Sequence, residues 1–212
     1  MVAGRWRRGD YQRPTLEVCR ALMGQRLVRL NRAGGRLAGL IVEAEAYIGQ
    51  DDLGCHAHAG RTRRNAVMWG PPGHAYVYFT YGMHWMLNLV AEREGFPAAV
   101  LLRAVVPSEG LRAMGARRRG RPQTQWTDGP AKLCQAFGLD GSWNGHDLCR
   151  PGSALFVEKR PAVPDEDVTW GPRVGLNSVP EPWKSLPWRA RLVRQRREAP
   201  QAEEGAHGVA GR

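Results

Sequence analysis

Hydrophobic and polar residues near the start of the chain follow first the period of a helix and then that of a strand. After Pro14, apolar side chains recur at helical spacing as far as Gly24, which predicts a short amphipathic helix. Residues 25–30 and 36–48 are rich in apolar side chains, and a turn with two glycines separates them. We therefore expect these two segments to pair as a β-hairpin.

Three more strand patterns follow in the middle of the chain, over residues 75–81, 86–91 and 97–106. Gly82 lies between the first two, and a glycine at such a place suits the tight turn of a hairpin. Short connections of this kind join antiparallel neighbours. The middle of the chain is therefore predicted to form a meandering sheet.

Helices are expected after this sheet. Residues 109–119 have the pattern of an exposed helix. A second helix covers residues 131–137 behind Gly129 and Pro130, because proline at a helix start lacks only an N–H that the first turn does not use. Residues 155–157 are predicted to form a late strand.

The length of 212 residues fits one domain with a β-rich or an α+β core. Hydrophobic residues make up 42%, and no run of about 18 apolar residues occurs, which favours neither a membrane span nor a disordered chain. Residues 195–212 are charged and rich in Ala and Gly without apolar periodicity. They are predicted to form a disordered tail behind a domain of residues 1–194.

The formal net charge is +11, from 31 basic and 20 acidic residues, and almost all the basic residues are arginines. This balance indicates an anionic partner, most commonly nucleic acid. A solvated surface that reflects codon bias is the alternative for the charge taken by itself. The first residues, MVAGRWRR, have no apolar segment behind them, which argues against a signal peptide and favours a cytoplasmic protein.

The cysteines give no sign of a metal site. Cys19, Cys55, Cys134 and Cys149 form no Cys-x-x-Cys motif and match no zinc or iron–sulfur spacing, so buried free thiols are expected. The C-H-A-H stretch that begins at Cys55 has no second ligand pair elsewhere and is more typical of a loop. No glycine motif for a nucleotide cofactor occurs either. The sequence therefore predicts no metal and no cofactor.

Two carboxylates share one face of the strand at residues 36–48. Alternation places Glu43, Glu45 and Tyr47 on one side and apolar residues on the other. An unpaired buried charge costs several kcal/mol, which is on the order of the stability of a whole domain. A buried strand therefore carries two acids only if they are paired or used. The alternative is an exposed face whose acids form ion pairs with neighbouring arginines.

Large flat side chains gather at the expected turn of the middle hairpin. Tyr76, Tyr78 and Tyr81 lead into Gly82, and Met83 follows at once. In a basic protein, a tyrosine beside a hairpin glycine can wedge between base steps or hold open the place of an extruded nucleotide. In a core, the same residues would simply pack.

Two polar residues interrupt otherwise apolar strands. Asn88 needs a hydrogen-bond partner if it is buried, and it could be a structural amide or a reader of base edges. Arg103 should pair with a carboxylate, for which Glu45 is the natural candidate. An arginine that orients a water together with a glutamate is a sensible hydrolytic pair, and a purely structural Arg–Glu bridge is the alternative.

At these motifs the chain resembles the alkyladenine (3-methyladenine) DNA glycosylase family, of the kind built without a helix-hairpin-helix motif. The resemblance extends from about Tyr11 to Arg194. Its specific parts are V-E-A-E-A-Y from Val42, R-N from Arg64, Y-V-Y from Tyr76, Y-G-M from Tyr81, Asn88, L-L-R-A from Leu101, G-P-A-K-L-C from Gly129 and R-V-G from Arg173. The family implies a single α+β domain with a curved antiparallel β-sheet, flanking helices and a protruding β-hairpin. It also implies a monomer that releases damaged purines from double-stranded DNA by hydrolysing the N-glycosidic bond.

The resemblance implies catalytic and base-binding roles for five residues. Glu45 would be the general base that activates a water, and Arg103 would help to hold that water. Tyr47, His56 and Tyr78 would line the base pocket, with the flipped base between Tyr47 and His56.

Five further residues would select the base or contact DNA. Asn88 would exclude normal guanine by crowding its exocyclic amine, and Tyr81 would fill the gap left in the duplex. Arg64, Met83 and Lys132 match positions of the family that contact DNA.

The expected enzyme is monofunctional. A ring-alkylated purine carries a positive charge and leaves readily, so a base-activated water suffices without strong acid catalysis. The three lysines, Lys132, Lys159 and Lys184, all lie outside the strand motifs, so a Schiff-base step lacks an obvious nucleophile. The expected substrates are purines of the 3-methyladenine, 7-methylguanine, hypoxanthine and ethenoadenine class.

Two rival functions stay open at this point. A non-catalytic nucleic-acid-binding module would use the same charge and aromatic residues, with structural acids. A metal-dependent nuclease would use Glu43 and Glu45 with further acids and a divalent ion. Turnover separates the first rival from a glycosylase, and insensitivity to EDTA would exclude the second.

Overall fold

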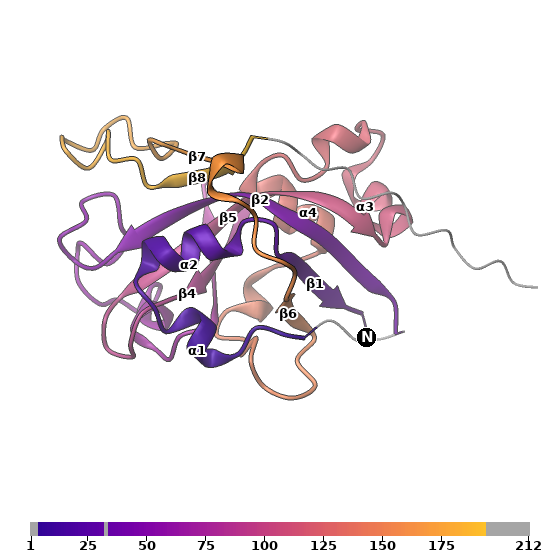
Figure 1. Ribbon diagram of the computed structural model, residues 1–212, viewed down its shortest axis with the longest axis horizontal. Coiled ribbons are helices and arrows are strands. Elements are labelled where there is room, and N and C mark those ends of the chain that lie inside the picture. Colours follow the sequence, from indigo (N-terminus) through magenta and orange to yellow (C-terminus); the bar gives the residue numbers. More distant parts are fainter. Residues whose placement is uncertain (1–3, 32–33, 194–212) are drawn as a thin grey trace, which may run out of the picture.

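An antiparallel sheet curls through the centre of this computed structural model, which describes residues 4–31 and 34–193 (Figure 1). Six strands follow one another in the order β3-β4-β5-β2-β1-β6, while β8 pairs with both β2 and β7. The strands are β1 (Arg26–Leu30), β2 (Arg36–Ile48), β3 (Ala75–Thr80), β4 (His84–Val90), β5 (Ala98–Glu109), β6 (Leu155–Glu158), β7 (Val168–Gly171) and β8 (Arg189–Leu192). The tail predicted for residues 195–212 lies outside the described residues.

Short helices flank the sheet, so the α+β fold with a curved antiparallel sheet is confirmed (Figure 1). Helix α2 contacts β2 and β5, and α4 contacts β4 and β5. The helices are α1 (Arg8–Tyr11), α2 (Thr15–Leu22), α3 (Leu111–Arg118) and α4 (Pro130–Phe137), with 3₁₀ turns at η1 (Ala66–Trp69), η2 (Gln123–Gln125), η3 (Gly141–Trp143) and η4 (Asp165–Asp167). Across the described part of the chain, none of these helices has the length and apolar character needed to cross a membrane.

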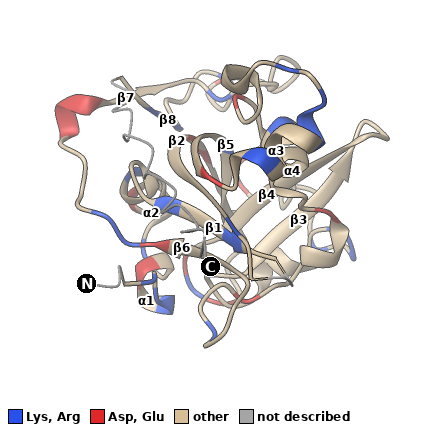
Figure 2. Cartoon of the chain, turned by 90° about the vertical axis from the view of Figure 1, so that its right-hand side faces the viewer, with Lys and Arg blue, Asp and Glu red and all other residues tan. Residues whose placement is uncertain are grey.

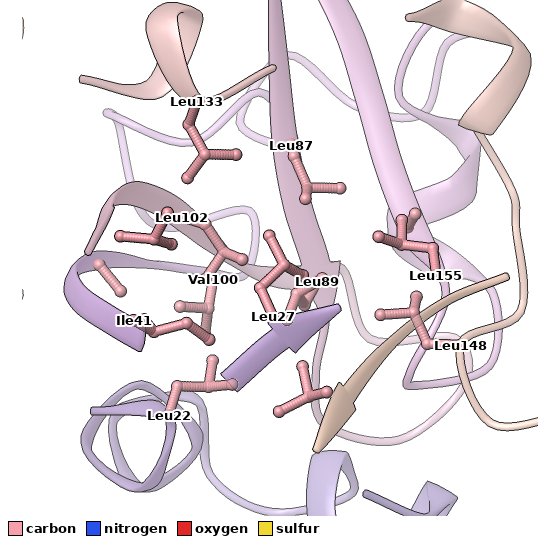
Figure 3. Packing of buried hydrophobic residues seen from close by; sticks show 14 of the residues in the cluster. Leu22, Leu27, Ile41, Leu87, Leu89, Val100, Leu102, Leu133, Leu148 and Leu155 are labelled. Carbon is pink, nitrogen blue, oxygen red and sulfur yellow. The ribbon is translucent and has the colours of Figure 1, made fainter. Parts of the chain in front are cut away.

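The main core lies between these helices and the sheet. Figure 3 shows Leu22 of α2 and Leu133 of α4 among sheet residues such as Leu89 and Val100. These four side chains are fully buried. Burying one leucine contributes about 1.5–3 kcal/mol, so a cluster of this kind gives the sheet a fixed position beneath the helices.

The cysteines are free, as the sequence predicted, and Cys19, Cys55 and Cys134 are buried. Cys149 is partly exposed, so the prediction of a buried thiol is wrong at that position. It lies in the loop before β6, where its backbone N–H donates to Asp147 at 2.8 Å and its side chain packs against the main core while staying partly exposed.

A local irregularity in the β2–β5 pairing shapes the middle of the sheet. Glu43 pairs with Ala104, but the register shifts on both sides of that pair. Such shifts mark β-bulges, which bend a strand and re-aim its side chains. The same stretch of β2 pairs with β8 on its other edge, where Glu45 is opposite Arg189. Glu43 and Glu45 therefore sit on a central strand held from both sides.

Strands β3 and β4 form the protruding hairpin that the sequence predicted, and they lie side by side at the right of Figure 2. The turn is closed by a hydrogen bond from the Met83 N–H to the Thr80 carbonyl at 3.2 Å. Tyr81 and Gly82 both have positive φ angles, 52° and 66°. A two-residue type I′ turn requires positive φ at both of its central residues. Tyr81 is 81% exposed and Met83 is 67% exposed, so the tip presents large apolar groups to solvent.

Candidate active site

A cavity of about 210 Å³ opens where β2, β3, β4 and β5 meet the segment of residues 174–176. Most of its wall is aromatic or apolar, and a few polar side chains point into it. Such a mixture is typical of a small-molecule binding site, in which a few polar groups fix the orientation of the ligand. The lining residues are Tyr47, Gly54, His56, Met68, Tyr76, Tyr78, Thr80, Tyr81, Met86, Asn88, Leu101, Arg103, Pro130, Val174, Gly175 and Leu176.

One wall of the cavity is built around His56. Its Nδ1 lies 2.9 Å from the Tyr76 hydroxyl, and its ring meets the Tyr78 ring edge-on at 4.4 Å between centroids. The Asn65 amide donates a hydrogen bond to the His56 carbonyl at 2.8 Å and so fixes the backbone of this loop. Burial, together with the charge of Arg64, lowers the pKa of His56 to about 4. The imidazole is therefore neutral at physiological pH.

The Glu45 side chain is fully buried, and three groups hold its carboxylate. Its Oε1 accepts a hydrogen bond from the Val174 backbone N–H at 2.7 Å and lies 3.3 Å from Nη1 of Arg103. Its Oε2 accepts a hydrogen bond from the Tyr47 hydroxyl at 2.9 Å. A carboxylate oxygen can accept two hydrogen bonds, and the Tyr47 hydroxyl is the one hydrogen-bond donor to Oε2 among the described residues, so one acceptor position of Oε2 is unused.

Glu45 lies directly behind the cavity wall, because its three partners, Tyr47, Arg103 and Val174, all line the cavity. Burial raises the pKa of Glu45 above its ordinary value of 4.5. The positive charge of Arg103 and the hydrogen bonds from Val174 and Tyr47 oppose that rise by favouring the ionised form. The exposed-face alternative for the strand acids is therefore wrong for Glu45.

Arg103 bridges both strand acids. Its Nε donates to Glu43 Oε1 at 2.9 Å, and its Nη1 lies 3.3 Å from Glu45. The predicted pairing with Glu45 is confirmed, and Glu43 is an additional and closer partner. Glu43 also accepts a hydrogen bond from Arg189 of β8 at 3.3 Å. Both acids are thus engaged by arginines, and the Arg103 side chain is fixed at the edge of the cavity.

Asn88 is buried and lines the cavity. Its amide N–H donates to the Tyr76 carbonyl at 3.1 Å, across the β3–β4 pair in which these two residues are opposite each other. The hydrogen-bond partner that the sequence required is therefore a backbone group of the neighbouring strand. The side chain keeps one fixed orientation at the cavity wall.

Of the four residues expected to contact DNA, Tyr81 lines the cavity, and Arg64, Met83 and Lys132 do not. Tyr81 lines the cavity from the hairpin tip, and Met83 is beside it. Arg64 donates to the Phe79 carbonyl at 3.1 Å and lies over the Tyr78 ring at 5.2 Å. Lys132 is on α4 and pairs with Asp128 at 3.0 Å, and it does not line the cavity.

Three residues at the site have no counterpart in the predictions from strand patterns: Asp52, Arg173 and Val174. Asp52 and Arg173 form a fully buried ion pair, with Asp52 Oδ2 2.6 Å from Arg173 Nη1. Val174 supplies the N–H that holds Glu45. The R-V-G stretch at Arg173 was one of the motifs of the family resemblance, and that was the only signal that could have pointed to this segment.

No group of three or more His, Cys, Asp or Glu side chains is arranged to hold a metal ion in the part of the chain that the structure describes. The histidines of the C-H-A-H stretch are turned to other partners. His56 contacts Tyr76, and His58 Nδ1 lies 3.3 Å from the Gln50 carbonyl.

The fold and the site together define a class of protein: an α+β domain with a buried carboxylate behind a cavity lined largely by aromatic and apolar residues. Comparison with known proteins identifies the family. The family model described as methylpurine-DNA glycosylase (MPG) matches residues 9–196. That span covers most of the chain, so the chain belongs to the methylpurine-DNA glycosylase (MPG) family and is a DNA glycosylase.

Individual relatives are similar over nearly their whole length. A protein of Methanocella arvoryzae is 49% identical over 183 residues, which is 86% of this chain and 89% of that protein. Proteins of Chlorobaculum parvum and Myxococcus xanthus are 44% and 45% identical over 179 residues, 84% of this chain and 83% and 85% of theirs. All three are provisionally named 3-methyladenine DNA glycosylases. Family membership removes the non-catalytic binding module as an alternative.

Proposed function

We propose that this chain is a monofunctional DNA glycosylase that flips alkylated or deaminated purines out of duplex DNA and hydrolyses the N-glycosidic bond with a water activated by Glu45. The substrates are purines of the 3-methyladenine, 7-methylguanine, hypoxanthine and ethenoadenine class. One observation carries the proposal: the buried Glu45 carboxylate lies behind the cavity wall with one oxygen still able to accept a hydrogen bond from a water.

The reaction needs one proton acceptor and one good leaving group. A water passes a proton to Glu45 as its oxygen bonds to C1′ of the sugar, and the bond from C1′ to the base nitrogen breaks with its electron pair moving to the base. A ring-alkylated purine is positively charged and leaves as a neutral base, whereas an uncharged purine such as hypoxanthine leaves as an anion that takes up a proton from solvent water. Arg103, which lines the cavity within reach of Glu45, helps to hold the water.

The cavity wall suits a flat and often cationic base. Tyr47 and His56 lie on either side of the flipped base, with Tyr78 beside them. Because His56 is neutral at physiological pH, it stacks on a positively charged purine without repelling it. Asn88, held by Tyr76, stands where the exocyclic amine of guanine would enter and so excludes that base.

Damaged double-stranded DNA is the proposed partner, bound by a monomer in the cytoplasm. The Tyr81 side chain fills the gap that the flipped nucleotide leaves, and Met83 packs beside it. Arg64 and Lys132 contact the phosphate backbone. The metal-dependent nuclease finds no support at Glu43 and Glu45, because arginines already engage both acids.

Glu45→Gln tests the proposal. The substitution keeps the shape of the side chain and removes the base, so single-turnover release of hypoxanthine from a duplex should slow by about 10²–10⁴-fold. Binding of the same duplex should stay within about threefold of wild type, since the cavity wall is unchanged. Glu43→Gln is the matched control on the same strand and should retain most of the activity. Excision by Glu45→Gln at the wild-type rate would show that another group is the general base, and Glu43 would be the first candidate.

A further inference from the structure

An ion pair whose side chains are both fully buried lies beside the cavity. The Arg173 guanidinium contacts Asp52 with two nitrogens, Nη1 to Oδ2 at 2.6 Å and Nη2 to Oδ1 at 2.7 Å. Such a fork-to-carboxylate contact fixes the orientation of both groups as well as their distance. The strand patterns in the sequence gave this pair no role, and the proposed mechanism does not use it.

The pair joins three segments of the chain. Asp52 accepts hydrogen bonds from the backbone N–H groups of Ile48 at 3.1 Å and Gly54 at 2.9 Å, which fold the loop after β2 around the carboxylate. Arg173 also donates to the Ala46 carbonyl at 3.0 Å, at the end of β2. The end of β2, the loop that follows it and the segment at residues 173–176 are thus locked together.

Two contacts connect this lock to the Glu45 carboxylate. Val174 follows Arg173 in the chain, and its N–H donates to Glu45 Oε1 at 2.7 Å. The Arg173 guanidinium carbon lies 4.7 Å from the centroid of the Tyr47 ring, within the range of a cation–π contact. Tyr47 in turn donates its hydroxyl hydrogen to Glu45 Oε2 at 2.9 Å. Arg173 therefore stands behind both hydrogen-bond donors of the carboxylate without touching it.

We propose that Arg173, held by Asp52, is a positioning residue for the reaction: it places the Val174 N–H and the Tyr47 hydroxyl so that both donate to Glu45. The inference rests on the proposed role of Glu45 as the base. It adds the pair of Arg173 and Asp52, which do not touch the reacting atoms. The orientation and the ionised state of Glu45 depend on this pair.

The expected signature is a change in the pH dependence of excision. The groups that face Glu45 are Arg103 of β5, Glu43 and Tyr47 of β2, Tyr78 of β3 and Cys19 of α2, besides the Val174 N–H. The Val174 and Tyr47 hydrogen bonds lower the pKa of Glu45 against the effect of burial. Loss of both donors therefore raises the pKa of Glu45, and the acid limb of the rate profile moves to higher pH.

Arg173→Lys tests the proposal, since it keeps the charge and removes the fork. Misplacing a catalytic group by about 1 Å can cost roughly 10²-fold, so single-turnover release of hypoxanthine should slow by about 10–100-fold. The acid limb should shift upward, while binding of the lesion duplex stays within about threefold. Arg36→Lys is the matched control. Arg36 holds Glu109 at 2.6 Å and Glu158 at 2.7 Å at the far end of β2, and its replacement should leave rate and pH profile at wild type.

The test separates this inference from the proposed function. Excision by Arg173→Lys at the wild-type rate, with an unmoved acid limb, overturns the positioning role. In a Glu45→Gln background, Arg173→Lys should slow the residual rate no further, and additional slowing shows that Arg173 does not act through Glu45. Glu45→Gln excising like wild type would instead defeat the proposed function itself.

A second variant keeps the proposal open to refutation if Arg173→Lys does not fold. Arg173→Met combined with Asp52→Asn leaves no charge at the position of the buried pair and keeps an oxygen for the Gly54 N–H. Its thermal unfolding is measured beside its excision. The same slow rate and shifted limb are expected from this folded protein, and a wild-type rate overturns the proposal. Loss of the fold in both variants would make the pair a stability element and overturn the proposal as well.

Discussion

At the level of single residues, the proposed mechanism requires the Glu45 carboxylate to be ionised before it can accept a proton from water. Burial works against that loss and raises its pKa, while Arg103, Val174 and Tyr47 work in favour of it. The ionised form exists above the pKa of Glu45 and disappears as pH falls through it. Excision should therefore fall on the acid side at a pH above the ordinary glutamate value of 4.5.

Two neutralising substitutions should move this acid limb in opposite directions. Arg103→Gln removes the positive charge that favours the ionised form of Glu45, so the limb moves to higher pH. Glu43→Gln removes a negative charge that disfavours it, so the limb moves to lower pH. Single-turnover rates of hypoxanthine release between about pH 4 and 8 measure both shifts. Limbs that move together, or not at all, would contradict the electrostatic coupling of these groups.

Sequence reasoning reached the residues of this cluster that lie on strands. Alternation placed Glu43, Glu45 and Tyr47 on one face, and the charge in an apolar strand required a carboxylate partner for Arg103. The strand patterns did not predict the pair of Asp52 and Arg173. These two residues are 121 positions apart in the chain and lie in segments without periodicity. Only the folded loops bring those two side chains together.

Among the elements, long strands with a clear pattern were predicted best. The bounds of β2 (Arg36–Ile48) are those predicted. In contrast, β5 (Ala98–Glu109) extends past its predicted end at residue 106, so α3 (Leu111–Arg118) begins two residues later than predicted. Strands β7 and β8 were missed. Each has only four residues and little apolar pattern, and they form by pairing with each other and with β2. Pairing energy of that kind leaves no local signal in the sequence.

The β3–β4 hairpin makes a prediction about stability and function together. Tyr81 has a φ of 52°, a left-handed conformation that asparagine adopts more readily than tyrosine. Tyr81→Asn should therefore raise the free energy of unfolding by about 1 kcal/mol. The same substitution removes the ring that we propose fills the gap of the flipped nucleotide, so lesion binding in duplex DNA should weaken by roughly 1–3 kcal/mol, and less in single strands.

Tyr81→Phe is the control for this hairpin prediction, because it keeps the ring and the strained backbone. Its unfolding free energy and its excision rate on duplex should both stay near wild type. Denaturant unfolding and single-turnover excision on matched duplex and single-stranded substrates give the comparison. A less stable Tyr81→Asn protein would show that the Tyr81 ring stabilises the hairpin rather than straining it.

On the scale of the whole molecule, the positive charge is spread over several surfaces. Figure 2 shows basic residues on α3, where Arg117 and Arg118 form the last turn. Others lie nearer the cavity: Arg63 and Arg64 line a groove beside Phe79 and the hairpin. A charge contributes to DNA binding only if it neutralises a phosphate, so the net charge alone does not say which surface binds.

The salt dependence of binding to undamaged DNA separates these surfaces. Each phosphate contact releases counterions and adds about 0.9 to the steepness of log K against log salt. Arg63→Gln, beside the hairpin, should therefore reduce the slope by about 1. Arg150→Gln removes the same charge from an exposed residue in the loop before β6, which lines neither the cavity nor the groove beside the hairpin, and should leave the slope unchanged. Equal slopes for both variants would place the phosphate contacts elsewhere, and a slope near zero for the unmodified protein would mean that its charge of +11 is only a solvated surface.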